Sequence, residues 1–265
     1  MGTWEPYVTT SSRPIAGELV VCRDATDRDV LVLLPPSYGA AARRYPVLYA
    51  HDGQNLFDEA TSYSGEWEID ESMAALAAEG LEAIVVGIPN GGPARGSEYS
   101  PWAQPDGGPG GADGYLDLVL GTIRPLVDGS FATDRGPART GILGSSLGGL
   151  VSLYAFFRHP GTFGYAGVLS PAFRWSGEAV FDFVAAAPPV EGRIWMDVGD
   201  NESPELPELR AAYVDDFDRM CALLGDKGYG PERLHSRLEP GGSHHESAWA
   251  RRFPDAMRFF LAPTA

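Results

Sequence analysis

Short, continuously apolar runs recur along the chain and predict strands that are buried on both faces. They cover residues 45–50, 81–89, 140–143, 163–169 and 193–199. Between these runs, apolar residues recur every three or four positions, which predicts amphipathic helices. The expected helices cover residues 69–77, 116–126, 147–157, 209–224 and 247–261. Strands that alternate with helices indicate an α/β fold with a mostly parallel central sheet and helices on both faces.

Two β-rich runs near the start, Glu18 to Arg23 and Asp29 to Leu34, flank a short polar segment and predict an antiparallel hairpin. A last strand is expected from His235 to Glu239. The chain has no internal repeat, low-complexity tail or linker-like segment. Residues 1–265 are therefore expected to form a single α/β domain.

Polar or glycine-rich loops follow several of the predicted strands. The loop of residues 90–112 is long, rich in Gly and Pro, and carries Tyr99 and Trp102. A long loop of this kind is typical of a functional segment. We expect Trp67, Tyr99 and Trp102 to contact a substrate, although the aromatic residues of the long loop could equally anchor that loop on the domain. Residues 173–187 predict a turn and a short helix that could overhang the site.

Charge and composition narrow the range of partners. The chain has 20 Lys and Arg against 36 Asp and Glu, a net charge of −16, which disfavours binding to nucleic acid or to anionic membranes. No apolar run approaches the roughly 20 residues that a membrane helix needs, and no secretory signal is recognisable at the start. A cytoplasmic protein is expected. The two cysteines, Cys22 and Cys221, are expected in the core.

The segment from Gly144 to Gly148 has the pattern Gly-Ser-Ser-Leu-Gly and lies between a predicted strand and a predicted helix. This is the sequence of a nucleophile elbow, in which a serine occupies a sharp turn with its hydroxyl exposed. The flanking glycines are needed because the two arms of the turn nearly touch. Ser146 is therefore the candidate nucleophile, and the helix that follows it favours developing negative charge.

A serine hydroxyl needs an imidazole to accept its proton and a carboxylate to orient that imidazole. In this architecture the acid and then the histidine follow the serine, each after a later strand. Asp200 and Glu202 follow the strand of residues 193–199, and His244 lies in a later glycine-rich loop. We prefer His244 to its neighbour His245, and Glu202 to Asp200, which remains the alternative acid.

The oxyanion formed by attack needs two donors. One is the backbone N–H of Leu147, directly after the nucleophile, and the other is expected from Gln54, because Gly53 lets the backbone turn toward the serine. For His51 and Asp52 a loop-bracing role is expected. The pair His244 and His245 has no further clustered ligands, so no metal site is expected.

At these residues the sequence resembles the putative esterase family, which includes enterochelin esterases, esterase D, feruloyl and acetylxylan esterases and the mycolyl transferases. The resemblance runs from residues 45–58, with the Asp-Gly-Gln-Asn loop, through residues 98–102 and the elbow to His244 and Trp249. It implies an α/β-hydrolase fold and a serine carboxylesterase that needs no cofactor. It also implies His244 as the base, from its spacing to Trp249, and an acid at Glu202.

The expected function is therefore hydrolysis of a small-molecule carboxylic ester through an acyl-enzyme. The ester could belong to an acylated sugar, a phenolic acid or a siderophore. Two alternatives remain: an acyltransferase that uses the same nucleophile, and a ligand-binding module that has kept the fold without activity.

Overall fold

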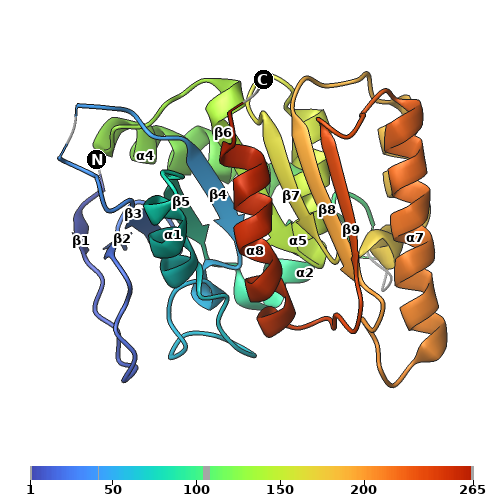
Figure 1. Cartoon of the computed structure of the whole chain (residues 1–265), viewed down its shortest axis with the longest axis horizontal. Coiled ribbons are helices and arrows are strands. Elements are labelled where there is room, and N and C mark those ends of the chain that lie inside the picture. Colours follow the sequence, from blue (N-terminus) through green and yellow to red (C-terminus); the bar gives the residue numbers. More distant parts are fainter. Residues whose placement is uncertain (1, 41, 104–107, 264–265) are drawn as a thin grey trace.

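The computed structural model describes residues 2–40, 42–103 and 108–263, which contain one sheet of nine strands. Its order is β1-β2-β3-β5-β4-β6-β7-β8-β9 (Figure 1). The strands are β1 (Trp4–Pro6), β2 (Glu18–Cys22), β3 (Val30–Leu34), β4 (Val47–His51), β5 (Ile84–Ile88), β6 (Thr140–Ser145), β7 (Tyr165–Leu169), β8 (Arg193–Gly199) and β9 (Leu234–Glu239). Strands β1, β2, β3 and β5 pair in antiparallel fashion. The strands from β5 onward in this order, which are β5, β4, β6, β7, β8 and β9, are parallel. The predicted parallel sheet and the β2–β3 hairpin are confirmed.

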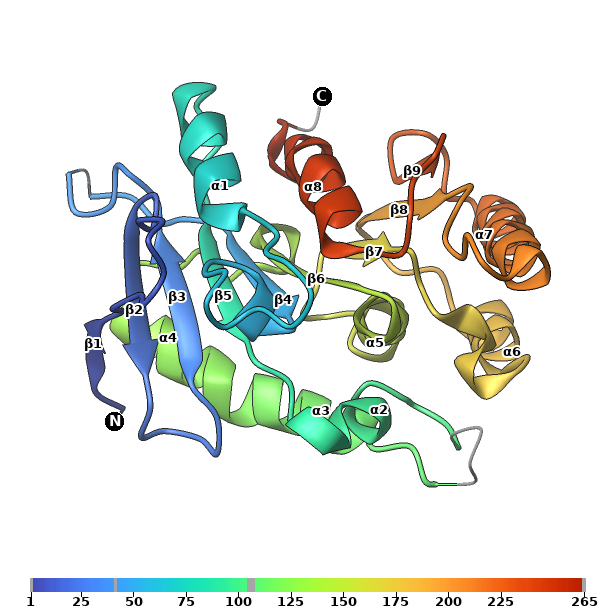
Figure 2. The same cartoon turned by 90° about the horizontal axis from the view of Figure 1, so that it is seen from below.

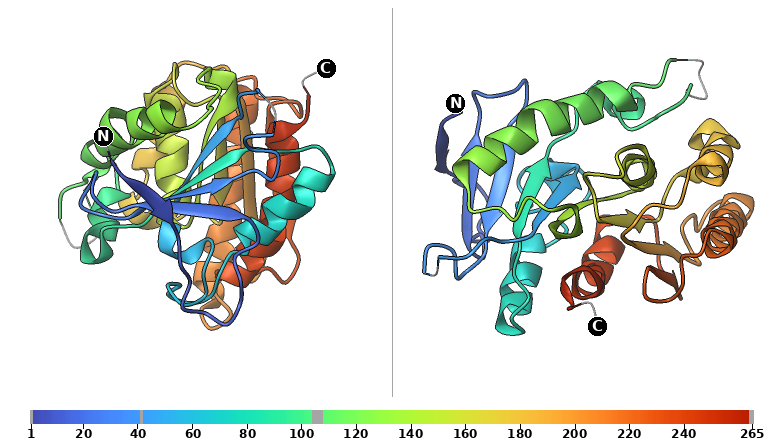
Figure 3. Two further views of the ribbon diagram at one scale, coloured as in Figure 1. Left: turned by 90° about the vertical axis from the view of Figure 1, so that its left-hand side faces the viewer. Right: turned by 90° about the horizontal axis from the view of Figure 1, so that it is seen from above.

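Helices cover both faces of this sheet (Figures 2 and 3). They are α1 (Ile69–Ala78), α2 (Arg95–Glu98), α3 (Ala112–Leu118), α4 (Arg124–Ser130), α5 (Leu147–Arg158), α6 (Ala179–Ala186), α7 (Pro207–Asp226) and α8 (Glu246–Leu261). Helices α1 and α8 pack together on one face, whereas α3, α4, α5, α6 and α7 lie on the other. The α/β-hydrolase fold expected from the sequence is thus present.

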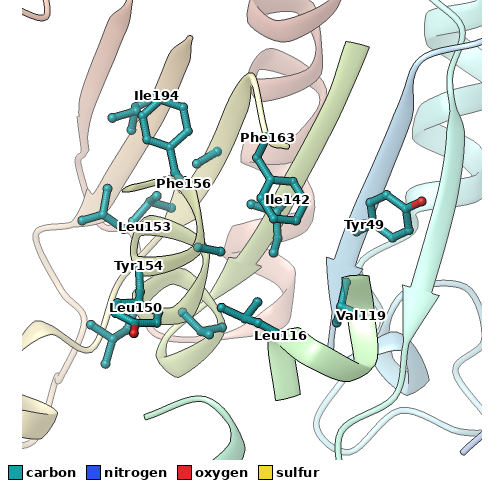
Figure 4. Packing of buried hydrophobic residues seen from close by; sticks show 14 of the residues in the cluster. Tyr49, Leu116, Val119, Ile142, Leu150, Leu153, Tyr154, Phe156, Phe163 and Ile194 are labelled. Carbon is teal, nitrogen blue, oxygen red and sulfur yellow. The ribbon is translucent and has the colours of Figure 1, made fainter. Parts of the chain in front are cut away.

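The strand pleat explains why the central strands are apolar throughout. In β4, Val47 and Tyr49 point into the core under α3 and α5, whereas Leu48 and Ala50 point into the core under α1 and α8. Successive side chains of a strand face opposite sides, so a strand covered on both faces needs apolar residues at every position. Figure 4 shows Tyr49 and other residues of the larger core around α5.

Several elements differ from the sequence-based expectation. Strand β1 was not predicted, and the expected strand of residues 81–89 begins only at Ile84. The predicted helix of residues 116–126 is longer, because α3 and α4 continue through a π-helical turn at Val119–Ile123. The long loop carries a 3₁₀ turn (Gly92–Ala94) and α2, while residues 104–107 lie outside the described residues. The segment of residues 173–187, expected to overhang the site, forms a 3₁₀ turn (Phe173–Ser176) and α6, and none of its residues lines the cavity of Ser146.

The parallel strands place their carboxyl ends at one edge of the sheet, the lower edge in Figure 1. The loops after β4, β6, β7, β8 and β9 therefore meet there, as expected for the site of an open α/β sheet. Within the described part of the chain, no helix combines the length and the apolar character needed to cross a bilayer.

Candidate active site

Ser146 lies in a strained turn between β6 and α5, with φ of 57° and ψ of −122°. The turn brings Gly144 and Gly148 so close that a Cβ on Gly144 would lie 2.8 Å from the carbonyl carbon of Gly148. A side chain at this point would force the two arms apart. The Ser146 N–H donates to the Leu169 carbonyl at 3.0 Å, which ties the turn to β7. The predicted strand-turn-helix geometry of the elbow is confirmed.

A cavity of about 790 Å³ opens above this turn and falls within the usual range of ligand pockets. Ser146 and His244 both line it, although no hydrogen bond joins their side chains in this structure. Such bonds are often long or misaligned before substrate binds. Most of the other residues that line it have polar side chains; the full set is Asp52, Gln54, Asn55, Thr61, Ser62, Tyr63, Ser64, Trp67, Pro89, Asn90, Gly92, Arg95, Ser145, Glu246 and Trp249.

His244 is held by Glu202, whose Oε2 lies 2.7 Å from Nδ1 of the imidazole. The other carboxylate oxygen, Oε1, accepts hydrogen bonds from the Ser170 hydroxyl at 2.5 Å and the Gly199 N–H at 2.6 Å. Burial acts to raise the pKa of Glu202, but the hydrogen bond and charge of His244, with the two donors on Oε1, lower that pKa below its usual value. An ionised carboxylate on Nδ1 leaves Nε2 as the ring nitrogen free to accept a proton.

Asp200, the alternative acid, lies at a different place. Its carboxylate accepts the N–H of Gly241 at 2.6 Å, and its side chain makes no hydrogen bond to His244. Asp200 thus braces the loop that carries His244, whereas Glu202 contacts the imidazole itself. His245 also has a local role, because its Nδ1 accepts the N–H of Ser247 at the start of α8.

The two backbone groups expected to hold an oxyanion are both free of protein acceptors. Neither the N–H of Leu147 nor that of Gln54 forms a hydrogen bond within the described part of the chain. Leu147 begins α5, where unpaired N–H groups favour negative charge. Gln54 lies in the 3₁₀ turn Gly53–Asn55 and lines the cavity.

The loop that carries Gln54 is fixed by an ion pair that the sequence analysis did not find. Arg95, in α2, donates two hydrogen bonds to the Asp52 carboxylate, at 2.7 and 2.8 Å. Asn90 donates a third at 2.6 Å. Asp52 itself has a left-handed backbone, with φ of 54°, and its N–H donates to the Tyr99 hydroxyl at 3.1 Å. These contacts bear out the loop-bracing role expected of Asp52.

His51 is buried directly beneath the elbow. Its Nδ1 lies 2.7 Å from the Tyr115 hydroxyl, and its Cδ2 would lie 2.9 Å from a Cβ on Gly144. Burial lowers the pKa of His51 to about 4, so the ring is neutral at physiological pH. His51 therefore supports the turn as an uncharged packing residue.

The three aromatic residues expected to contact a substrate differ in position. Trp67 lines the cavity, where it packs on Trp249 with 5.6 Å between ring centroids. Tyr99 is fully buried and contacts Asp52 and His51, and Trp102 packs on Tyr154 and Phe183. Neither Tyr99 nor Trp102 lines the cavity of Ser146; both anchor the long loop on the domain, which is the alternative that the sequence left open.

Two polar residues behind Glu202 were also missed. Ser170 follows β7, and Arg252 lies on α8 with its side chain fully buried. A signal for Arg252 is present in the sequence, because a charged residue stands between Trp249 and Phe253 on the apolar face of an amphipathic helix. A charge at such a position needs buried partners.

In the described part of the chain, one group of acidic side chains has the spacing of metal ligands. Glu66, Asp70 and Glu71 each place one carboxylate oxygen within 4.8 Å of the others. None of the three lines the cavity of Ser146, and Arg13 forms ion pairs with Glu66 and Glu71 at 3.5 and 2.7 Å. The cluster thus already faces a cation supplied by the chain.

Comparison with known proteins gives relatives along nearly the whole length. The chain is 33% identical over 248 residues to the siderophore triacetylfusarinine C esterase of Aspergillus fumigatus, covering 82% of this chain and 81% of that protein. It is 26% identical over 244 residues to the protein YbbA of Bacillus subtilis strain 168, covering 89% and 93%. A solved structure of the enterobactin and salmochelin hydrolase IroE superposes with a TM-score of 0.69 at 21% identity, covering 95% and 98%, which shows a shared fold.

The family model described as "Putative esterase" matches residues 25–260. The matched segment contains the elbow, the His244–Glu202 pair and the Gln54 loop. Together with the full-length relative from Aspergillus fumigatus, this match shows that the chain belongs to the putative esterase family of carboxylic ester hydrolases.

Proposed function

We propose that this esterase hydrolyses its substrate through an acyl-enzyme formed on Ser146, with His244 as general base and Glu202 as the acid that orients it. The observation that carries the proposal is the Glu202 carboxylate on Nδ1 of an imidazole that shares one cavity with the strained serine. In the first step Ser146 Oγ attacks the ester carbonyl while His244 Nε2 takes its proton. The carbonyl oxygen becomes an oxyanion between the N–H groups of Leu147 and Gln54.

The same residues act in the later steps. His244 returns the proton to the leaving alkoxide, so the alcohol departs and the acyl group stays on Ser146. Water then attacks the acyl-enzyme while His244 accepts one of its protons, and collapse of the second tetrahedral intermediate releases the acid and restores the serine hydroxyl. Glu202 remains ionised throughout and stabilises the imidazolium. No cofactor enters these steps.

We also propose that the substrate is a siderophore ester. The relative from Aspergillus fumigatus is a siderophore triacetylfusarinine C esterase, and it matches most of this chain. The size of the cavity and the many polar residues that line it support a substrate larger than a simple acetate and rich in polar groups. The Arg95 guanidinium and the Asn90 amide, which line the cavity, have N–H groups beyond those that bind Asp52 and can donate them to such a molecule.

The chemical proposal is tested with p-nitrophenyl acetate and butyrate, using the natural chain and Ser146→Ala. We expect the substitution to lower kcat by several orders of magnitude, with residual catalysis from the oxyanion donors and binding. A fluorophosphonate probe should label the natural chain and leave Ser146→Ala unlabelled. Equal rates or equal labelling in both proteins would refute the role of Ser146.

The substrate proposal is tested separately. Triacetylfusarinine C, enterobactin, a feruloyl ester and an acetylated sugar are compared by kcat/KM with the same enzyme. A siderophore ester should exceed the other two classes at least tenfold. A higher kcat/KM for the feruloyl or sugar ester would refute the siderophore assignment and leave the acyl-enzyme route intact.

A further inference from the structure

A fully buried arginine lies behind the proposed triad. Arg252 projects from α8 toward the ends of β7, β8 and β9, and its side chain is completely inaccessible to solvent. One terminal nitrogen contacts the Asp197 carboxylate, and the other lies 3.2 Å from the Ser170 hydroxyl and 3.9 Å from Oε1 of Glu202. Nε lies 3.1 Å from a Glu239 oxygen and donates to the Ala248 carbonyl. One guanidinium therefore joins groups from four segments.

Arg252 supplies the positive charge that faces a group of buried carboxylates. Three carboxylates face it: Asp197 in β8, Glu202 after β8 and Glu239 at the end of β9. Of these, Glu239 has further cations at its outer side, Arg237 at 3.9 Å and Arg251 at 3.7 Å. Among the described residues, Arg252 is the only lysine or arginine within ion-pair distance of Asp197 and Glu202.

Two aromatic side chains complete the surroundings of Asp197 and of the His244–Glu202 pair. Tyr213, on α7, packs against the His244 ring with 5.2 Å between centroids, and Trp195 donates to Oδ2 of Asp197 at 2.6 Å. Burial raises the pKa of Asp197 to about 6, against the opposing effect of Arg252. Removing a buried cation from such a site is costly, because the carboxylates left behind must stay unpaired or take up protons.

Ser170 connects Arg252 to the oxygen that orients Glu202. The Ser170 hydroxyl donates to Oε1 of Glu202, while it accepts hydrogen bonds from Arg252 and, at 3.0 Å, from Trp249 Nε1. Because these two donors occupy the lone pairs of the hydroxyl oxygen, its single proton points toward Glu202. Oε1 is thereby fixed, and Oε2 is presented to His244.

We propose that Arg252 is a positioning residue for catalysis: through its charge and through Ser170 it keeps Glu202 ionised and aimed at His244. The proposal rests on the proposed acyl-enzyme mechanism. Arg252 itself touches neither the substrate nor the reacting atoms. Its loss allows Glu202 to hold a proton to higher pH, and a protonated Glu202 no longer stabilises the imidazolium.

Protonation of Glu202 at a higher pH moves the acid limb of the pH profile of kcat/KM toward higher pH. We expect Arg252→Met to shift that limb upward by about 1 pH unit, as opposite charges within this distance do. At pH 7 kcat should fall about 10²-fold, the usual effect of a misplaced catalytic group, with KM nearly unchanged. Arg252→Lys keeps the charge and should restore most of the acid limb while recovering only part of kcat.

Two further variants keep the test sound if Arg252→Met folds poorly. Ser170→Ala removes the bridging hydroxyl alone and should lower kcat about tenfold with KM unchanged. Arg258→Met removes exposed ion pairs of the same helix, to Glu79 and Asp255, and should leave the pH profile unaltered. Circular dichroism and thermal melting of each variant establish that it is folded.

The outcomes separate this proposal from the mechanism on which it depends. If the natural chain and Ser146→Ala hydrolyse esters equally, the acyl-enzyme mechanism fails. The second outcome is that Ser146→Ala is inactive, while the variants at Arg252 and Ser170 that fold keep the natural kcat and the natural acid limb. In that case Arg252 is only structural and the positioning role is refuted. A raised KM with unchanged kcat would likewise assign these residues to substrate binding.

Discussion

Three residues with unusual backbone angles stand directly after three neighbouring strands of the sheet. Asp52 follows β4, Ser146 follows β6 and Ser170 follows β7, with φ of 54°, 57° and 40°. Positive φ is costly for residues with a side chain and persists where the surrounding contacts fix it, typically at functional sites. Here Asp52 is held by Arg95, and Ser170 by hydrogen bonds to Glu202 and Arg252. The strained positions thus mark the loop proposed to hold the oxyanion, the proposed nucleophile and the residue that supports the proposed acid.

The choice between the two acids can be decided by single substitutions. Glu202→Gln keeps the shape of the side chain but removes the charge that stabilises the His244 imidazolium, so we expect kcat to fall about 10³- to 10⁴-fold. Asp200→Asn keeps an oxygen that can accept the Gly241 N–H and should stay within about threefold of the natural kcat. Steady-state hydrolysis of p-nitrophenyl acetate measures both. An active Glu202→Gln beside an inactive Asp200→Asn would reverse the assignment.

At the scale of elements, the loop proposed to hold the oxyanion depends on a close approach between the 3₁₀ turn Gly53–Asn55 and β5. A Cβ on Gly53 would lie 2.6 Å from the backbone of Gly87 and of Ile88. Backbone atoms in the middle of a sheet cannot move aside, so Gly53→Ala should push the turn, and with it the Gln54 N–H, away from Ser146. We expect a loss of about 1–3 kcal/mol in the free energy of unfolding. We also expect kcat to fall at least tenfold.

Urea denaturation and steady-state kinetics check this prediction. The matched control is Gly114→Ala, in α3, where an added Cβ meets no atom within 4 Å. That substitution should stabilise the chain by about 0.5–1 kcal/mol, because alanine has the higher helix propensity, and should leave kcat unchanged. If Gly53→Ala behaves like the control, the close approach does not position the oxyanion loop.

The sequence alone predicted the elements whose pattern is local. The central strands are apolar at every position and the elbow has its two glycines, so the parallel sheet and the turn at Ser146 followed from periodicity and motif. The positions of Tyr99 and Trp102 did not, because an aromatic residue on a long loop has the same local signature whether it faces a cavity or a core. The partners of Arg252, including Ser170, were equally hidden, since they come from the ends of β7, β8 and β9, which only the folded chain brings together.

For the whole molecule, the acidic cluster at the start of α1 sets a pH dependence of stability. Asp70 is 1% exposed, its Oδ2 accepts the Ala16 N–H at 2.6 Å, and its Oδ1 has no partner. Burial, and then the neighbouring Glu71, raise the pKa of Asp70 to about 7, and burial with Asp70 raises that of Glu66 to about 7. In the unfolded chain both carboxyls release their protons near pH 4.

Between about pH 4 and pH 7 the folded state therefore binds more protons than the unfolded state, so these two groups lower the free energy of unfolding as the pH rises. Asp70→Asn keeps the acceptor for Ala16 and replaces the unpartnered oxygen with an N–H₂ group that can donate to Glu66 or Glu71. We expect it to stabilise the chain by about 1–3 kcal/mol at pH 8, and by much less at pH 5, where the natural carboxyls are already protonated. Denaturation in urea at both pH values measures the difference, with the exposed Asp218→Asn as control. An equal effect of Asp70→Asn at the two pH values would contradict the proton linkage. Destabilisation at pH 8 would mean that Arg13 compensates the buried charge of Asp70. Its ion pairs with Glu66 and Glu71 would then outweigh the cost of crowding the three carboxylates.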